Sequence, residues 1–403
     1  MNPEELFSAA LGLTGGWKVV KCDFHGEPKR LELHLDFAPG TRFAAPGAKE
    51  LCPVHDTVDK QWRHLNFFQY ETLLHARVPR VWTPDGKVVQ AEVPWARAGS
   101  GFTLLFEALV MMLAQRMPVS EVAECLAEID TRLWRVVMHY VGEAQRARDW
   151  SQVRRVMVDE TSARRGHRYV SCFVDVDTRE LLFMAEGRGN EVFAAFAQEL
   201  CTHGGKTEQI ELLCMDMSPA FERGASEYFP EAEIVYDHFH LMQLAGRALD
   251  EVRKSLRREG AQMPDSLWAI RGNENTRTAE QLARRRELCR LYPKLGRAMA
   301  LRQTLQDILS DEDEESLRWW IRRAKLSRLE PFRKLAFSLQ EHWAGVVCFM
   351  KTRVTNGVIE AINGLLQLAK RSARGFRSFK CFQAIAYLKA GRLRLHLPEY
   401  LPT

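Results

Sequence analysis

The first hundred residues alternate apolar and polar positions over short stretches, a pattern that predicts β-strands. In RLELHLDF the residues Leu31, Leu33 and Phe37 alternate with polar ones, and Pro and Gly interrupt the pattern in APGTRFAAPGAKE and TPDGK. We therefore expect a small β-rich module over residues 1–98. The bulky side chains expected in its core are those of Trp62, Leu65, Phe67, Phe68 and Trp95.

From Phe102 to about Glu143 the apolar positions take a helical period. In MPVSEVAECLAEIDTRLWRVVMHYV, small and apolar residues stand at the offsets of a helix-turn-helix, namely Ala123, Ala127, Leu133 and Val136. The second helix would expose Arg132, Arg135 and His139 to phosphates or guanine edges. Two ordinary packed helices would show the same spacing. We assign residues 99–150 to a helix-turn-helix DNA-binding domain.

Residues 152–237 alternate short apolar runs, such as RRVMVD, YVSCFVDV and IELLCMD, with helical stretches, which predicts a mixed α/β sheet. Strand patterning is then lost, and Arg, Glu, Leu and Ala dominate up to about residue 345. The predicted order is a first part of an α/β domain (151–244), an all-helical insertion (245–345) and a final part (346–403) that carries a helix over 352–371.

Two carboxylates end apolar runs where another apolar residue would be expected. Asp216 follows Leu212 to Met215, and Asp159 ends RRVMVD. A strand end is rigid and lies at the rim of a sheet, where a metal ion and a nucleic acid can enter. We expect Asp159 and Asp216 to lie on neighbouring parts of one sheet and to share a divalent ion.

The helix in TRVTNGVIEAINGLLQLAKR supplies a third carboxylate, Glu360. Its predicted buried stripe consists of Val354, Val358, Ile362, Leu365 and Ala369, and its polar face consists of Arg353, Asn356, Glu360, Asn363, Gln367 and Arg371. One acid among amides and arginines suits a metal ligand whose neighbours hold phosphates better than it suits a solvated face. The competing interpretation is that Glu360 only pairs with Arg353.

The charge distribution points to a polyanionic partner. The 403-residue chain has a net charge of +5, yet residues 351–403 contain ten Lys or Arg and only two Glu. A solvated basic face is the other reading, and the acidic run at 311–315 is expected to be solvated. Candidate phosphate contacts follow the acids: Arg164, Arg165 and His167 after Asp159, and Lys370, Arg371, Arg374 and Arg377 after Glu360.

Several classes of protein are excluded. The apolar run Leu104 to Ala114 is too short to span a bilayer and contains Glu107, and the N-terminus lacks the basic flank of a signal peptide, so we expect a cytoplasmic protein without a membrane partner. The nine cysteines are scattered and read as reduced thiols. The pairs Cys22/His25 and Cys52/His55 have C-x2-H spacing, which arises by chance, and we do not expect a zinc site there.

Over nearly its full length the chain resembles the ISL-three family of bacterial insertion-sequence transposases. The resemblance rests on WRHLNFFQYETLLHARVPRV, VPWARAGSGFTLLFEALV, DTRLWRVVMHYV, VDETSARRGHRYV, CMDMSPAF, YDHFH and TNGVIEAINGLLQLAKRSARGFR. It implies a ribonuclease H-like DDE catalytic domain whose three acids match Asp159, Asp216 and Glu360. It also singles out Asp237 and His240 in DHFH as residues that support the site.

The resemblance further implies a mechanism and partners. Two Mg²⁺ or Mn²⁺ ions would assist cleavage at the terminal inverted repeats of double-stranded DNA, followed by attack of the freed 3′ hydroxyl on target DNA. Pairing of two ends makes a homodimer or higher assembly on the nucleoid an expectation. Similar proteins carry an N-terminal zinc module, but here the matching stretches are APGA and WTPDG, so this β-rich module is expected to bind DNA ends as a degenerate, zinc-free ribbon.

Two other functions stay open. A regulator derived from a transposase would use the helix-turn-helix with a silent catalytic domain. A ribonuclease H-like nuclease would hydrolyse DNA without joining it. A sugar or nucleotide enzyme with an α/β core is a more remote third reading, because the final section is so basic.

Overall fold

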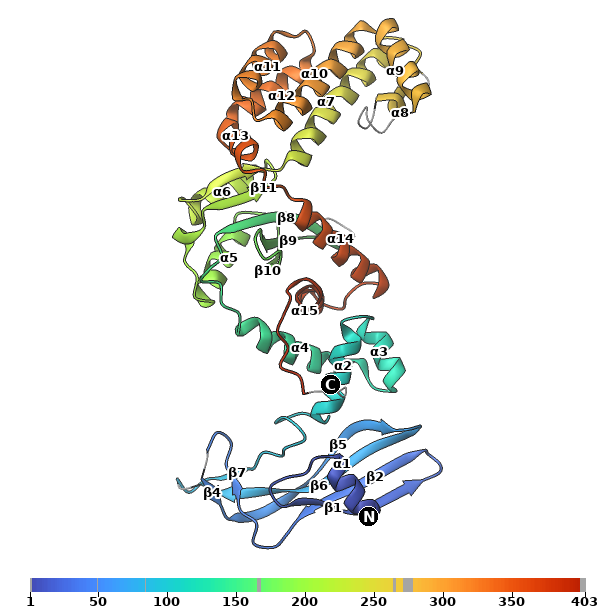
Figure 1. Ribbon diagram of the computed structural model, residues 1–403, viewed down its shortest axis with the longest axis vertical. Coiled ribbons are helices and arrows are strands. Elements are labelled where there is room, and N and C mark those ends of the chain that lie inside the picture. Colours follow the sequence, from blue (N-terminus) through green and yellow to red (C-terminus); the bar gives the residue numbers. More distant parts are fainter. Residues whose placement is uncertain are drawn as a thin grey trace. The chain divides into compact units, whose positions relative to one another are not determined.

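The computed structural model describes residues 2–48, 50–83, 85–164, 168–263, 266–270 and 278–398. The chain divides into two compact units, Met1–Ala144 with Arg394–Thr403, and Gln145–Leu393 (Figure 1). Each is described by itself below. Among the described residues, no helix has both the length and the apolar character that a bilayer crossing requires.

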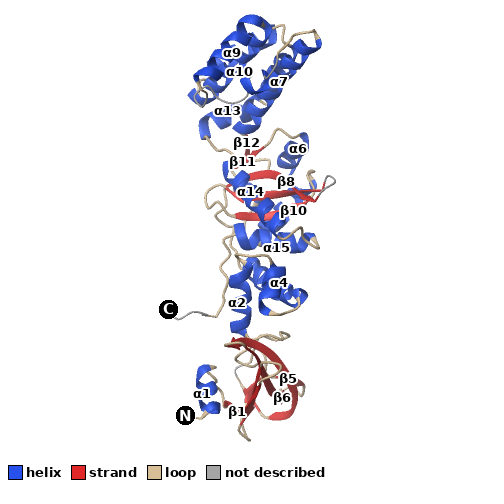
Figure 2. Ribbon diagram, turned by 90° about the vertical axis from the view of Figure 1, so that its right-hand side faces the viewer, coloured by secondary structure: helices blue, strands red, loops and turns tan. Residues whose placement is uncertain are grey.

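The N-terminal part of the first unit is a sheet with the strand order β1-β2-β6-β5, to which β7 is added beside β6. Figure 2 shows the strands of this sheet in red. Strand pairs are antiparallel except β2 with β6, and a separate two-stranded ribbon is formed by β3 and β4. The elements are α1 (Pro3–Ala10), β1 (Trp17–His25), β2 (Arg30–Phe37), β3 (Phe43–Ala44), β4 (Leu51–Cys52), β5 (Val54–Phe67), β6 (Tyr70–Trp82) and β7 (Val88–Gln90).

The expected β-rich module is therefore present, and its core follows the alternation in the sequence. Leu31 and Leu33 on β2 are fully buried, and Trp95 packs edge-to-face against Trp17 and Trp62. Phe68 was expected in this core, and that prediction is wrong. The residue lies in the tight turn between β5 and β6 with φ 53°, and its side chain is 80% exposed because the turn directs it away from the sheet. Leu65 and Phe67 are only partly buried.

Three helices complete the first unit: α2 (Leu104–Ala114), α3 (Val119–Leu126) and α4 (Asp130–Arg146). Ala127 ends α3 in the left-handed conformation at φ 51°, which allows the chain to turn sharply into α4. Ala123, Leu133 and Val136 are buried, as their spacing predicts. This burial is compatible with a helix-turn-helix and with two ordinary packed helices.

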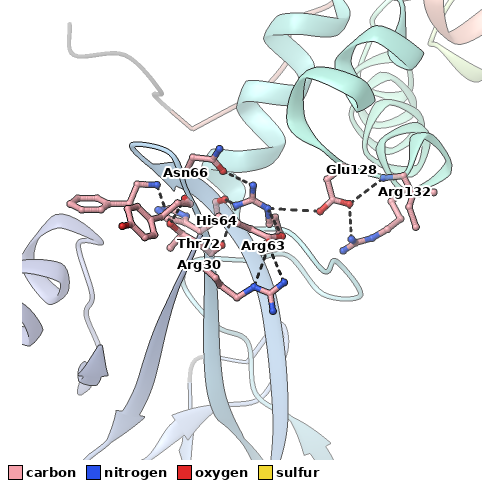
Figure 3. Close-up of polar contacts among 11 residues, drawn as sticks. Arg30, Arg63, His64, Asn66, Thr72, Glu128 and Arg132 are labelled. Atoms are coloured by element: carbon pink, nitrogen blue, oxygen red, sulfur yellow. Dashed lines mark hydrogen bonds and ion pairs between the residues drawn. The ribbon is translucent and has the colours of Figure 1, made fainter. Parts of the chain in front are cut away.

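A buried arginine joins the sheet of this unit to its helices (Figure 3). Arg63 on β5 is 5% exposed, donates to the carbonyl oxygens of His64 and Thr72 and to the side chain of Asn66, and lies over the ring of Phe106. Its Nε lies 3.4 Å from Glu71 of β6 and 4.0 Å from Glu128, which precedes α4. We call this network the Arg63 joint.

The second unit is built on a five-stranded mixed sheet in the order β10-β9-β8-β11-β12. The three strands β8, β9 and β10 are antiparallel, whereas β11 is parallel to both β8 and β12. Their bounds are β8 (Arg155–Arg164), β9 (Arg168–Asp175), β10 (Leu181–Glu186), β11 (Leu212–Met215) and β12 (Glu233–Tyr236), and a 3-10 turn, η1 (Thr207–Gln209), precedes β11.

Helices cover both faces of this sheet. Val156 and Val158 of β8 share a buried cluster with aromatic residues of α5 (Glu191–Thr202) and α6 (Pro219–Tyr228). Because side chains alternate along a strand, Asp159 and Thr161 belong to the opposite face. There α14 (Gly357–Ser372) contacts β8 and α15 (Phe379–Ala390) contacts β10 (Figure 1).

The expected helical insertion separates β12 from α14. It comprises α7 (His238–Arg258), α8 (Ser266–Ile270), α9 (Ala279–Leu291), α10 (Pro293–Asp311), α11 (Glu314–Leu326), α12 (Glu330–Glu341) and α13 (Trp343–Thr352), and α7 runs through residue 245 without interruption. The acidic run at 311–315 was expected to be solvated, and four of its five members are exposed, with Glu314 partly buried. Within this exposed run Asp313 caps α11, Glu312 pairs with Arg353 and Glu314 pairs with Lys351.

Candidate active site

Strand register brings three aspartates to one level of the sheet. The parallel pairing of β11 with β8 matches Cys214 to Met157, and its pairing with β12 matches Met215 to Tyr236. Continued by two residues, the pairing with β8 places Asp216 beside Asp159. Continued by one residue, the pairing with β12 places Asp216 beside Asp237. The carboxyl ends of the parallel strands thus assemble the acidic residues that the sequence separates.

Asp159 was expected to end its strand, and this detail is wrong. β8 continues to Arg164 because β9 pairs with it beyond Asp159, at Ser162 and Arg164. The strand that does end at this level is β11, which leaves the Asp159 side chain accessible from the rim. Its Oδ1 accepts a hydrogen bond from the Glu160 backbone N–H at 2.7 Å, and its Oδ2 accepts one from Asn363 Nδ2 at 2.7 Å.

Asp216 and Asp237 are held by residues at the start of the insertion. Asp216 Oδ2 lies 3.0 Å from His240 Nδ1, one turn into α7. Asp237, 2% exposed, caps α7 by accepting from the His240 N–H at 3.0 Å, and its other oxygen accepts from the Asn356 N–H at 3.0 Å. Asp237 therefore connects β12, α7 and the start of α14, and His240 orients Asp216.

Glu360 lies in the first turn of α14 with its side chain exposed at the rim. Partial burial, together with the nearby carboxylates of Asp237 and Asp216, raises the pKa of Glu360 above its usual value. The competing interpretation, pairing with Arg353, is contradicted: Arg353 ends α13 and binds Glu312 at 3.0 Å and the carbonyl oxygens of Leu309 and Ser310. Arg353 is thus engaged at the end of α10, and no ion pair with Glu360 is found among the described residues.

The buried face of α14 differs from the predicted stripe. Ile359, Ile362, Leu366 and Ala369 are buried, whereas Leu365 is 37% exposed. The helix is rotated because part of its polar face docks on β8: Asn363 binds Asp159, Gln367 donates to Thr161 Oγ1 and to the Ser162 carbonyl at 2.8 Å each, and Lys370 donates to the same carbonyl. Polar contacts between α14 and β8 therefore hold Glu360 close to the aspartates.

Burial and the neighbouring carboxylates at this rim change the pKa of the Asp159 carboxyl. Burial, with Asp216 and Asp237 adding repulsion, raises the pKa of Asp159 to about 7 despite the hydrogen bonds from Glu160 and Asn363. A carboxyl whose pKa is higher in the folded chain destabilises that chain once it ionises. Below about pH 4 the Asp159 carboxyl is protonated in both the folded and the unfolded state, and it does not lower the free energy of unfolding. The destabilisation grows between about pH 4 and about pH 7 and is complete above pH 7.

We therefore expect Asp159→Asn to raise the melting temperature of the metal-free protein, and to do so more at pH 8 than at pH 4.5. A gain of about 1 kcal/mol corresponds to roughly 2 to 4 °C in a unit of this size. Differential scanning calorimetry at both pH values, in the presence of a chelator, tests this. A melting temperature lowered by Asp159→Asn at pH 8 would contradict the assignment of a repulsive acidic rim.

The donor chemistry of this site suits a hard divalent cation. The donors are carboxylate and amide oxygens, and the buried Oδ1 atoms of Asn356 and Asn363 have no hydrogen-bond partner. Across the part of the chain that the structure describes, no three His, Cys, Asp or Glu side chains form a closed group that could already hold an ion. The chemistry of these oxygen donors thus suits a divalent cation, but the described side chains are not close enough together to form a complete binding group.

The predicted phosphate contacts are distributed around this rim. Arg165 and His167 lie outside the described residues; Arg164 ends β8, and nothing is described of its side chain. Lys370 and Arg371 occupy the last turn of α14, with Lys370 bound to the Ser162 carbonyl and Arg371 exposed. Arg374, at φ 52°, and Arg377 follow the helix and are exposed. Lys370 and Arg371 thus lie at the end of the helix that carries Glu360, and Arg374 and Arg377 lie in the segment after it.

The predicted DNA-reading residues of α4 differ in their surroundings. Arg135 is exposed, and His139 is partly buried against Tyr140. Arg132 is already engaged, because it binds Glu128 at 2.7 Å and lies 4.3 Å from the centre of the Phe102 ring. The Arg63 joint includes Glu128, so Arg132 belongs in part to that joint (Figure 3).

The two Cys and His pairs of the N-terminal module serve ordinary contacts. Cys22 lies on β1 opposite Leu33, and His25 is exposed at the end of that strand. Cys52 is buried on β4, and His55 packs against Trp82 and lies 3.4 Å from Asp56.

Sequence reasoning missed two participants. Asn363 was placed on the polar face of its helix without a role, and its spacing of three residues from Glu360 was the available signal. Arg63 gave no signal, because an arginine in a strand is most often exposed.

Comparison with known proteins agrees with this architecture. Residues 156–386, more than half of the chain, match the DDE family of ISL3 described as transposase, and residues 91–141 match the helix-turn-helix domain of transposase family ISL3. The transposase for insertion sequence element IS1557 of Mycobacterium tuberculosis is 27% identical over 375 residues, 84% of this chain and 83% of the relative. The transposase for insertion sequence element IS1001 of Bordetella parapertussis is 26% identical over 393 residues, 91% of this chain and 94% of the relative. The chain therefore belongs to the ISL3 family of transposases.

Proposed function

We propose that this transposase cuts DNA at the terminal inverted repeats of its insertion sequence and joins the freed 3′ hydroxyl to target DNA, with Asp159, Asp216 and Glu360 as the catalytic acids. The observation that carries the proposal is the register of β8 and β11, which puts two aspartates side by side at a rim that Glu360 also reaches. A family that moves DNA needs phosphoryl-transfer chemistry, and acids gathered at a rim suit it.

The strand order supports a ribonuclease H-like arrangement for this catalytic domain. Three antiparallel strands are followed by two parallel ones. Asp159 lies on the central strand β8, Asp216 directly follows the neighbouring strand β11, and Glu360 lies on a helix across one face. We propose that segments 151–244 and 346–403 form this domain around the insertion 245–345. Segments 1–98 and 99–150 would bind DNA ends through the β-rich module and the helix-turn-helix.

Asp159, Asp216 and Glu360 would hold Mg²⁺ or Mn²⁺, in the two-ion arrangement typical of such sites. Divalent ions bound there would neutralise charge on the reacting phosphate and lower the pKa of an attacking water. The chain's own residues prepare the site: His240 orients Asp216, and Asp237 fixes the start of α14 relative to β12. These two residues support the acids by positioning them.

The basic residues around the rim are proposed to hold the DNA backbone beside the acids. Arg374 and Arg377 are exposed and follow directly after the helix of Glu360. Each phosphate that a cation neutralises contributes about 0.9 to the slope of log affinity against log salt concentration.

We expect Arg374→Gln with Arg377→Gln to weaken binding to the DNA that flanks the gene and to reduce the salt slope by about 2. Fluorescence anisotropy across a range of NaCl concentrations measures both. Arg179→Gln is a matched control, because this exposed arginine also has a positive φ, 60°, but lies in the β9–β10 turn at the opposite edge of the sheet. Equal slopes for the double variant and the wild type would make these arginines ordinary surface residues.

The decisive experiment uses the DNA flanking the gene. The purified protein is incubated with labelled fragments of both flanks, a supercoiled plasmid, and Mg²⁺ or Mn²⁺. Cleavage at one position and joining to the plasmid is the expected result. Cleavage without joining would favour a nuclease, and binding without cleavage in either metal would favour a regulator. Light scattering of the DNA complex tests the proposed dimer or higher assembly.

A further inference from the structure

Asn363 combines two features that helix docking alone does not explain. Its side chain is 9% exposed, on the turn of α14 that follows Glu360, and its Nδ2 donates to Asp159 Oδ2 at 2.7 Å. Its Oδ1 is buried and has no hydrogen-bond partner among the residues that the structure describes. A buried polar atom without a partner has lost its hydration with nothing to replace it, so its retention calls for a reason.

The orientation of this amide follows from its surroundings. An ionised carboxylate only accepts hydrogen bonds, so the Asn363 amide must present its NH₂ group to Asp159. The Oδ1 atom of Asn363 is thereby left without a hydrogen bond among the described residues, although it belongs to the same planar amide that contacts Asp159. Asn356, one turn before Glu360, likewise has a buried and unpartnered Oδ1. Because positions 356, 360 and 363 share one helix face, amide oxygens flank Glu360 on both sides.

Gln367 shows what a purely docking residue looks like at the next turn of this face. Its Nε2 donates to Thr161 Oγ1 and to the Ser162 carbonyl. Among the described residues, the one side-chain hydrogen bond of Asn363 is to the Asp159 carboxylate. Gln367 therefore attaches α14 to β8 through Thr161 and Ser162, whereas Asn363 contacts a proposed catalytic acid.

We propose that Asn363 positions the Asp159 carboxylate with its Nδ2 and supplies its Oδ1 as a neutral oxygen ligand to a divalent cation held between Asp159 and Glu360. The proposal rests on the proposed metal-dependent function and extends its ligand set. A neutral ligand adds an oxygen without adding another negative charge to a rim where Asp159, Asp216 and Asp237 already stand at one level. Carbonyl oxygens are normal ligands of Mg²⁺ and Mn²⁺.

The test measures binding of Mn²⁺ to the full-length protein, with and without the flanking DNA, by electron paramagnetic resonance of the free ion. Four variants are compared: Asn363→Leu, Asn363→Asp, Gln367→Leu as the docking control, and Asp159→Asn as the reference for loss of the site. We expect Asn363→Leu to weaken Mn²⁺ binding by about 10-fold or more. Gln367→Leu removes only contacts that attach α14 to β8, so it should weaken Mn²⁺ binding much less than Asn363→Leu does.

Asn363→Asp keeps an oxygen but places a new charge beside Asp159. Without metal it should melt below the wild type, and saturating Mn²⁺ should raise its melting temperature by more than that of the wild type. This variant keeps the proposal testable if Asn363→Leu does not fold. A smaller rise than in the wild type would overturn the ligand assignment.

The remaining outcomes distinguish failure of the proposed role of Asn363 from failure of the proposed metal-dependent function. If the wild type binds Mn²⁺ no better than Asp159→Asn, the proposed metal site at these acids fails, and the role of Asn363 fails with it. If the wild type binds and Asn363→Leu binds equally well, only the inference fails. If Asn363→Leu and Gln367→Leu weaken binding to the same extent, Asn363 acts through docking and is not a ligand.

Discussion

Asp216→Asn is expected to slow metal-dependent cleavage of the flanking DNA by about 10³-fold or more, and to leave the fold intact. The amide keeps the size and the hydrogen-bonding reach of the carboxylate, so His240 can still contact residue 216. What is lost is the negative charge that a divalent ion requires at the end of β11. Cleavage is measured on a sequencing gel with Mg²⁺ and with Mn²⁺, and circular dichroism reports the fold.

Asp177→Asn serves as the control for this substitution. Asp177 is exposed beyond the end of β9, pairs with Arg155, and lies at the edge of the sheet opposite the acidic rim. Exposed ion pairs contribute little to stability. Its variant should cleave normally, whereas normal cleavage by Asp216→Asn would refute the catalytic assignment.

Arg63→Met is expected to destabilise the first unit by about 3 kcal/mol, because it removes the central cation of a buried polar network. Methionine fills most of the arginine volume, so packing against Phe106 is largely kept. The backbone carbonyls of His64 and Thr72 would lose this donor, and Glu128 would lose one of its two cationic neighbours and keep Arg132. Urea unfolding followed by tryptophan fluorescence measures the loss, since Trp62 adjoins the site.

Arg77→Met is the matched control for the Arg63 joint. Arg77 lies on the neighbouring strand β6, binds Asp36 at 2.8 Å and is 57% exposed. An exposed pair is worth far less than a buried one, so this variant should unfold close to the wild type. Equal unfolding curves for the two variants would show that the joint between β5 and the helix-turn-helix adds no stability.

Much of the fold and part of the candidate site were predictable, because both depend on local patterns. Alternation over 31–37 predicted β2, and the helical spacing predicted the burial of Ala123, Leu133 and Val136. The carboxylate after the apolar run 212–215 predicted that Asp216 follows a buried strand. Each of these features is carried by residues only a few positions apart.

The predictions that failed concerned the direction in which a side chain points. Phe68 was expected inside and is exposed, because a hydrophobic residue in a two-residue turn points where the turn directs it. Leu365 was assigned to the buried face of α14, but the docking of Asn363 and Gln367 on β8 rotates the helix. Periodicity gives the spacing of a stripe, and the partner that the helix meets selects which stripe is buried.

The sequence by itself determined the kinds of element, their order and the residues able to bind metal, since period, turn chemistry and charge are local properties of the chain. Only the tertiary structure decided which strands are neighbours, and therefore that Asp159 and Asp216 stand at one level. It also decided that Arg353 is bound by Glu312 and that Asn363 meets Asp159 across 204 residues. Contacts of that range arise from packing of the whole unit, and no local pattern encodes them.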